Sequence, residues 1–194
     1  VGSYKRTINL PQNWLKKDVF LRFGSIRSAC YVWVNGKYIG YSQGSKTPTE
    51  FDVTDYIQAG QNQVAVKVLR FSDGSYLEGQ DTWRISGLER DVSLYAREKA
   101  RIEDFTILSS LDETYEIGKF SINIDMVNRS ELSKNYLVRA KLTDPKRRNR
   151  TVFDLRQSIA IDSSANTSFE HSIRRVKTWS AEKPYLYRLQ LFLY

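Results

Sequence analysis

The sequence predicts an all-β protein built from two consecutive β-sandwich domains. Apolar side chains recur at every second position in many short runs, which is the period of a β-strand, and no segment carries a sustained apolar stripe at helical spacing. In residues 30–34, for example, Cys30, Val32 and Val34 lie on one face and Tyr31 and Trp33 on the other. Turn residues separate the runs at short, regular intervals, which is typical of a sandwich.

The runs fall into two sets, separated by a polar stretch at residues 98–103. Asn35-Gly36, between two runs of the first set, is a strong hairpin signal because both residues tolerate positive φ. The first set of expected strands covers residues 4–10, 19–23, 30–34, 37–41, 63–71 and 91–97. The second set covers residues 105–109, 118–127, 136–143, 152–161, 167–173 and 187–194. We therefore expect one domain over residues 1–98 and another over residues 99–194.

Composition excludes several classes of function. None of the 194 residues belongs to an apolar run long enough to span a bilayer, so we expect no membrane partner. The single cysteine, Cys30, rules out an internal disulfide, and together with the single histidine, His171, it is too little for a structural zinc site. We expect Cys30 to be buried in a strand and His171 to lie at the surface or rim of the second domain.

The net charge of +8 raises the question of nucleic-acid binding. The densest basic cluster lies in residues 146–150, between two strand-like runs, and indicates a solvated hairpin tip. Further basic residues, such as Arg174, Arg175 and Lys177, are interleaved along the chain with acidic and apolar ones. We therefore expect no nucleic-acid partner.

Residues 72–90 form an irregular stretch with no clean period, rich in glycine, carboxylates and aromatic rings. A loop of this length inside a compact domain is uncommon and is usually functional or disordered, and its aromatic content argues against disorder. Carboxylates and aromatic faces suit a sugar ligand. The alternative is structural: the aromatic residues plug the end of the sandwich and the acids pair with Arg84 and Arg90. Composition alone does not separate these two interpretations.

Several blocks of sequence, in order and at consistent spacing, carry a resemblance to a known family. Within the irregular stretch they are residues 72–78, 80–81, 83–84, 86–87 and 90–92. Upstream they are residues 19–23, 32–36, 40–43, 47–48 and 50–52, and near the end of the chain residues 179–187. Together these blocks resemble β-galactosidases of glycoside hydrolase family 2, strongly over residues 1–97 and more weakly afterwards.

The resemblance implies an architecture and a parent activity. It implies a jelly-roll-like, galactose-binding-like sugar-binding domain over residues 1–98, lacking its first strands, and an immunoglobulin-like β-sandwich over residues 99–194. The catalytic barrel of the family would follow and is absent from this sequence. The parent would be a retaining enzyme that hydrolyses terminal β-D-galactosides, and homo-oligomeric like many relatives. The missing early strands predict an open sheet edge or apolar groove in the first domain.

One site residue is implied by the resemblance. Asp81 matches a family aspartate that reaches the barrel's active site, contacts galactose hydroxyls and helps to hold sodium. Asp81 is therefore the expected substrate-binding and sodium-binding residue, in the full-length enzyme only, since hard cations prefer several oxygen ligands. Sodium and magnesium are expected there, and no cofactor in this chain. Gly79 stands where many relatives carry a second acid.

Two classes of function compete with support of a β-galactosidase. One is a free-standing carbohydrate-binding module with Tyr76 and Trp83 as a stacking platform; the other is an interaction domain that uses its basic face. Independent catalysis needs two carboxyls about 5–5.5 Å apart, one held protonated. Glu78 and Asp81 lie on an exposed loop without obvious desolvation, so we expect no catalytic residue in this chain. Under the leading hypothesis Tyr76 and Trp83 pack inward and stiffen the loop.

Overall fold

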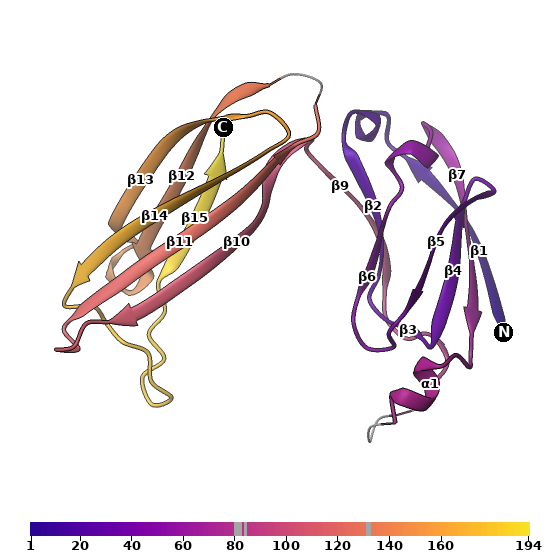
Figure 1. Cartoon of the computed structure of the whole chain (residues 1–194), viewed down its shortest axis with the longest axis horizontal. Helices are drawn as coiled ribbons and strands as arrows, with labels where there is room; N and C mark the ends of the chain where they lie inside the picture. The colour runs from indigo at the N-terminus through magenta and orange to yellow at the C-terminus, as the bar shows by residue number, and fades with distance from the viewer. Residues whose placement is uncertain (80–82, 84, 131–132) are drawn as a thin grey trace. The chain divides into compact units, whose positions relative to one another are not determined.

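The computed structural model describes residues 1–79, 83, 85–130 and 133–194. The chain divides into two compact units, Val1–Glu98 and Lys99–Tyr194 (Figure 1). Each unit is a β-sandwich, as the period of two predicts. Helix among the described residues is limited to α1 (Gly74–Leu77) and the 3-10 turns Gln12–Lys16, Thr54–Tyr56 and Pro145–Arg147. No helix in this described part is long and apolar enough to cross a membrane.

The first unit packs a four-stranded antiparallel sheet against a three-stranded one. The larger sheet has the order β1 (Gly2–Leu10), β7 (Gly60–Leu69), β4 (Ala29–Val34), β5 (Lys37–Gln43). The smaller has the order β6 (Thr49–Asp52), β2 (Asp18–Phe23), β9 (Val92–Arg97), and β3 (Ile26–Arg27) pairs with β8 (Gly87–Leu88). The predicted hairpin joins β4 to β5, with Asn35 at φ 51° and Gly36 at φ 78°. The resulting turn sets the register Val34↔Lys37.

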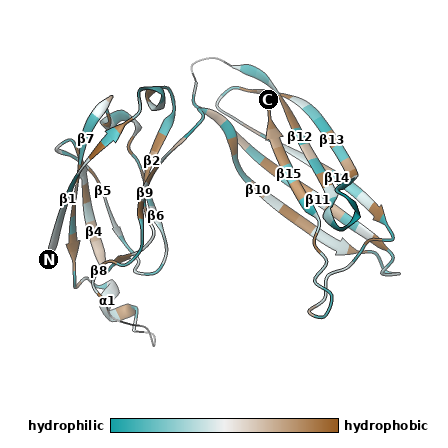
Figure 2. Ribbon diagram, turned by 180° about the vertical axis from the view of Figure 1, so that it is seen from behind, coloured by the Kyte–Doolittle hydropathy of each residue, from teal (hydrophilic) through white to brown (hydrophobic). Residues whose placement is uncertain are grey.

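Alternation places one face of each strand in the core of this unit. Cys30, Val32 and Val34 of β4 are buried, as expected, and they pack in one cluster with Val19 and Phe23 of β2. Figure 2 shows the resulting alternation of hydrophobic and hydrophilic colours along the strands. The strand expected over residues 63–71 begins earlier in the structure: β7 starts at Gly60, which pairs with Leu10 of β1.

An apolar groove lies open on the first unit, as the resemblance led us to expect. Its volume is about 510 Å³. Among the described strands, β1 and β9 each pair on one side only, and both contribute to its walls. Its apolar lining residues are Tyr4, Ile8, Leu21, Phe23, Val64, Val66, Leu88, Val92 and Leu94.

The second unit consists of two three-stranded antiparallel sheets. One has the order β10 (Ala100–Leu111), β11 (Ile117–Asn128), β14 (Ser164–Arg174). The other has the order β13 (Arg150–Ile161), β12 (Lys134–Asp144), β15 (Arg188–Leu193). The core lies between the sheets and is formed by Ile122, Ile124, Met126, Val138, Ala140, Leu142, Phe153, Ile161 and Phe169. In β11, Ser121, Asn123 and Asp125 alternate with these core residues, as expected for a sheet with one face in the core and the other facing solvent.

Candidate functional site

The irregular stretch that links β7 to β9 carries the candidate site. It opens with α1, whose first backbone N–H, that of Gly74, donates to Asp73 Oδ1 at 3.0 Å. Ser72 Oγ lies 3.1 Å from Ser28 Oγ, which follows β3. The loop is therefore fixed at its start by a capping aspartate and by a hydroxyl contact with the body of the sandwich.

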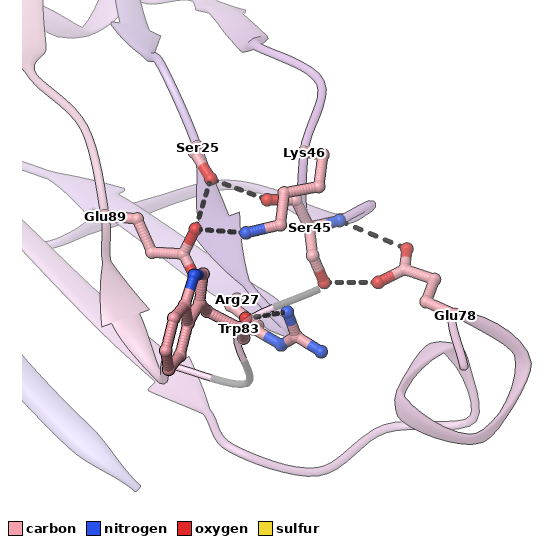
Figure 3. A network of polar contacts seen from close by, with 7 residues as sticks. All are labelled: Ser25, Arg27, Ser45, Lys46, Glu78, Trp83 and Glu89. Carbon is pink, nitrogen blue, oxygen red and sulfur yellow. Dashed lines mark hydrogen bonds and ion pairs between the residues drawn. The ribbon is translucent and has the colours of Figure 1, made fainter. Parts of the chain in front are cut away.

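Glu78 forms the main contact between this loop and the segment that follows β5. Glu78 Oε1 accepts a hydrogen bond from the Ser45 backbone N–H at 3.1 Å, and Glu78 Oε2 accepts one from the Ser45 hydroxyl (Figure 3). The hydroxyl contact is the main cause that lowers the pKa of Glu78, and the positive charges of Arg27 and Lys46 act in the same direction. The carboxyl group is therefore ionised and occupied in the free chain.

Arg27 holds the loop through a hydrogen bond to the loop's backbone. Its side chain is 7% exposed, and Nη1 donates to the backbone carbonyl of Trp83 at 2.7 Å. Arg27 lies in β3, whose partner β8 follows the loop, so the same short pairing holds the guanidinium and the returning chain. An arginine suits this position because its several N–H donors can hold a backbone carbonyl and keep their charge.

A second link joins the same two segments through Glu89. Lys46 Nζ lies 2.7 Å from Glu89 Oε2, and Ser25 Oγ donates to the Ser45 carbonyl at 2.6 Å. Figure 3 shows Ser25, Ser45 and Lys46 between the two carboxylates. Glu78 and Glu89 thus bond to Ser45 and Lys46, in the segment after β5. The structural interpretation had expected the acids of this stretch to pair with arginines such as Arg90.

The aromatic rings of the loop do not pack inward, and this expectation was wrong. Tyr76 and Trp83 are each 83% exposed. The reason lies in what holds the loop: a carboxylate at Glu78 and a backbone carbonyl at Trp83, neither of which needs a ring against the core. Both rings are therefore available to a ligand or to another protein surface.

Asp81, the predicted substrate and sodium ligand, lies outside the described residues, as do its neighbours Gln80 and Arg84. Its predicted role is not tested by the contacts above. Among the described residues, no group of three or more His, Cys, Asp and Glu side chains is placed to hold a metal ion. A sodium or magnesium ion would therefore need oxygen ligands beyond those described in this chain.

Two residues of the network were missed from the sequence. Ser45 and Arg27 stand in short segments without a clear period, and neither belongs to the irregular stretch. The one available signal was Arg27 as the single charged residue within residues 23–30, because an arginine in such a run needs a partner if it is buried. Of the other singled-out residues, Cys30 is buried as expected, and His171 is half-buried with its ring centroid 5.0 Å from that of Phe153.

Comparison with known proteins relates the two units to one family. Residues 1–98 match the sugar-binding domain of glycosyl hydrolases family 2. Residues 100–194 match a second domain of glycosyl hydrolases family 2.

Similar proteins are much longer than this chain. It is 41% identical over 194 residues to a β-galactosidase of Priestia megaterium, covering 100% of this chain and 19% of that protein. It is 36% identical to a β-galactosidase of Pectobacterium atrosepticum, covering 99% of this chain and again 19% of the relative. The chain thus spans about a fifth of the length of these curated relatives.

Solved structures agree on the fold. A β-glucuronidase of Bacteroides uniformis superposes with a TM-score of 0.84 at 22% identity, covering 98% of this chain and 24% of that one. A protein of Bacteroides fragilis described as a putative β-galactosidase gives a TM-score of 0.84 at 18% identity, covering 98% of this chain and 30% of that one. With both of its units matched, the chain belongs to glycosyl hydrolase family 2.

Proposed function

We propose that this chain is the non-catalytic support region of a β-galactosidase and that its loop over residues 72–90 completes an active site in another part of a longer protein. One observation carries the proposal: the whole chain aligns with proteins named β-galactosidase at 36–41% identity, yet spans 19% of their length. The parent would hydrolyse terminal β-D-galactosides with retention, through a pair of carboxyls in its own catalytic domain.

The two hydrogen bonds from Ser45 to Glu78, here called the clamp, would position the loop for this function. A substrate contact must be held within a fraction of an ångström by rigid supports. Glu78, Arg27 and Lys46 anchor the loop on both sides of Asp81 through contacts of 2.7–3.1 Å. Asp81 would then accept hydrogen bonds from galactose hydroxyls and add one oxygen to a sodium site. Sodium would supply a fixed positive charge for those hydroxyls.

The chain alone is expected to be inactive. Glycoside hydrolysis needs a carboxylic acid that is protonated near neutral pH. Glu78 is unsuited to that role, since hydrogen bonds from Ser45 lower its pKa and occupy both of its oxygens. The hydrogen bonds that position the loop thus keep Glu78 ionised, so it cannot act as the acid.

The test compares the 194-residue chain with the complete gene product on a chromogenic β-galactoside. We expect turnover by the complete protein and none by the chain. A complete protein that hydrolyses no β-galactoside would overturn the proposal. So would turnover by the chain that scales with its concentration and disappears in Glu78→Gln or Asp81→Asn.

The exposed rings of Tyr76 and Trp83 favour a second candidate, a carbohydrate-binding module that acts without a catalytic partner. Aromatic faces that stand free of the core can stack on the C–H faces of a sugar. Calorimetric titration of the chain with galactose and lactose separates the two. Saturable binding that is lost in Trp83→Ala and kept in Trp179→Ala, the matched control in the second unit, would establish the module. The leading proposal predicts no saturable binding by the isolated chain.

A further inference from the structure

Two basic segments of the second unit, distant in the sequence, meet around one pocket. Arg147 and Arg150 lie at the turn between β12 and β13, and Arg174, Arg175 and Lys177 lie at the end of β14 and just beyond it. Because β13 and β14 belong to different sheets, residues of both layers line the pocket. Its volume is about 240 Å³. The remaining lining residues are Asp144, Thr151, Val152, His171, Ser172, Ile173 and Tyr187.

The described lining of this pocket carries a net positive charge, since five basic side chains face one carboxylate. The nearest contact is long: Arg147 Nε lies 3.8 Å from Asp144 Oδ2. Within the described part of the chain, no carboxylate comes within ion-pair distance of Arg150, Arg174, Arg175 or Lys177. Cations gathered in this way repel one another, and a concave site lined by one sign of charge concentrates counter-ions.

Asp144, the only carboxylate in the lining, is already occupied. Its Oδ1 accepts hydrogen bonds from the Tyr185 hydroxyl at 2.6 Å and from the Lys146 backbone N–H at 3.1 Å. Its side chain is buried, and its single negative charge offsets only one of the five basic side chains in the lining. The pocket therefore offers an anion a set of donors with a single buried acid behind them.

Neutral donors complete the set. Tyr187 Oη accepts from the Lys177 backbone N–H at 3.0 Å, which leaves its own hydroxyl hydrogen to point elsewhere. Thr151 and Ser172, each with a hydroxyl group, also line the pocket. Planar guanidinium groups match the oxygens of a tetrahedral anion, and hydroxyl donors add further hydrogen bonds to it.

We propose that this pocket binds a doubly charged tetrahedral oxyanion, either inorganic phosphate or the phosphate group of a small phosphate monoester. The pocket is compact, with a volume of about 240 Å³, so a small anion fits it better than an extended single strand of nucleic acid. The proposal is independent of the function proposed for the first unit.

The test is titration of the 194-residue chain, followed by calorimetry and by amide chemical shifts, at constant ionic strength set with chloride. The three titrants are inorganic phosphate, galactose 6-phosphate and a short single-stranded DNA. We expect saturable phosphate binding with a dissociation constant below about 1 mM. Amide shifts should move at Thr151, Ser172 and Lys177. A tighter constant for the sugar phosphate than for phosphate would identify a monoester as the ligand, and equal constants would identify the free anion.

Variants decide whether the pocket is responsible. Arg174→Gln should weaken phosphate binding roughly tenfold, because one charged hydrogen bond is lost. Arg150→Gln should weaken phosphate binding by a similar factor. With two variants, a folding defect in one of them does not leave the proposal untested. Lys134→Gln is the matched control, since it removes one charge at the opposite end of β12. Equal affinity in all three variants, phosphate binding no tighter than chloride, or binding of DNA alone would overturn the proposal.

Discussion

Replacing Glu78 by glutamine should loosen the loop over residues 72–90 from the first unit. Glutamine keeps the shape of the side chain and one acceptor oxygen, so it can still accept from the Ser45 backbone N–H. It loses the charge and the second acceptor, which binds the Ser45 hydroxyl. The change therefore removes the charge-assisted part of the clamp without opening a cavity.

The size of the effect follows from these contacts. A hydrogen bond to a charged group contributes about 1.5–3 kcal/mol when it is buried. Glu78 is half-buried and water can replace part of the contact, so we expect a loss of about 1 kcal/mol for Glu78→Gln. The opening equilibrium of the loop would then rise roughly fivefold.

The stabilisation by Glu78 should depend on pH. Hydrogen bonds lower the pKa of Glu78 below its ordinary 4.5, so the folded loop favours the ionised form. The stabilisation is thus present above that ordinary value and is lost as the pH falls through the lowered one. The difference between wild type and Glu78→Gln should shrink as the pH falls below that ordinary value.

Hydrogen exchange at the Ser45 amide is the suitable assay, since that N–H donates directly to Glu78. Protection should fall in Glu78→Gln and stay at the wild-type level in Asp55→Asn, a control that removes an exposed carboxylate on the 3-10 turn Thr54–Tyr56. Equal protection in both variants at pH 7, or a difference that persists undiminished at pH 3, would refute the clamp.

Three further predictions concern groups outside the loop. Ile122→Ala should destabilise the second unit by about 2–5 kcal/mol in urea unfolding, because Ile122 is fully buried. Leu108→Ala, at a position that is 63% exposed, should change the stability little. Similar losses in the two variants would place the core elsewhere. Burial raises the pKa of Cys30 to about 11, so a thiol reagent at pH 8 should label it only after unfolding, and rapid labelling of the native chain would count against this. The hydrogen bond to Asp144 raises the pKa of Tyr185 to about 12, so wild type should lose stability relative to Tyr185→Phe between pH 10 and 12, and parallel alkaline unfolding curves would contradict this.

Periodicity predicted the long strands because burial of one face leaves its mark on every second residue. β4 and β11 show this in Val32 and Ile122, each fully buried with polar or half-buried neighbours. The short strands β3, β6 and β8 escaped prediction, since two to four residues cannot display a period. The longer strand β2 holds β6 in register, whereas β3 and β8 pair with each other.

The site was predictable only in outline. The composition of residues 72–90 indicated a functional loop, but the contacts that hold it depend on Ser45 and Arg27, which tertiary structure brings to it. The direction of Tyr76 and Trp83 could not be read from residue type, because aromatic rings serve equally as core and as binding surface. The basic pocket was likewise hidden, since only the packing of β13 against β14 joins its two halves.

The most direct test of the account is kcat/KM of the complete gene product carrying Asp81→Asn, measured on a β-galactoside with and without sodium and compared with wild type. If Asp81 holds galactose hydroxyls and sodium, the loss of one charged hydrogen bond should cost about 1.5–3 kcal/mol, roughly a 10-fold to 150-fold fall in kcat/KM. The response to sodium should weaken together with it, while thermal unfolding stays at the wild-type temperature. An unchanged kcat/KM and sodium response in a variant that melts like wild type would contradict the account.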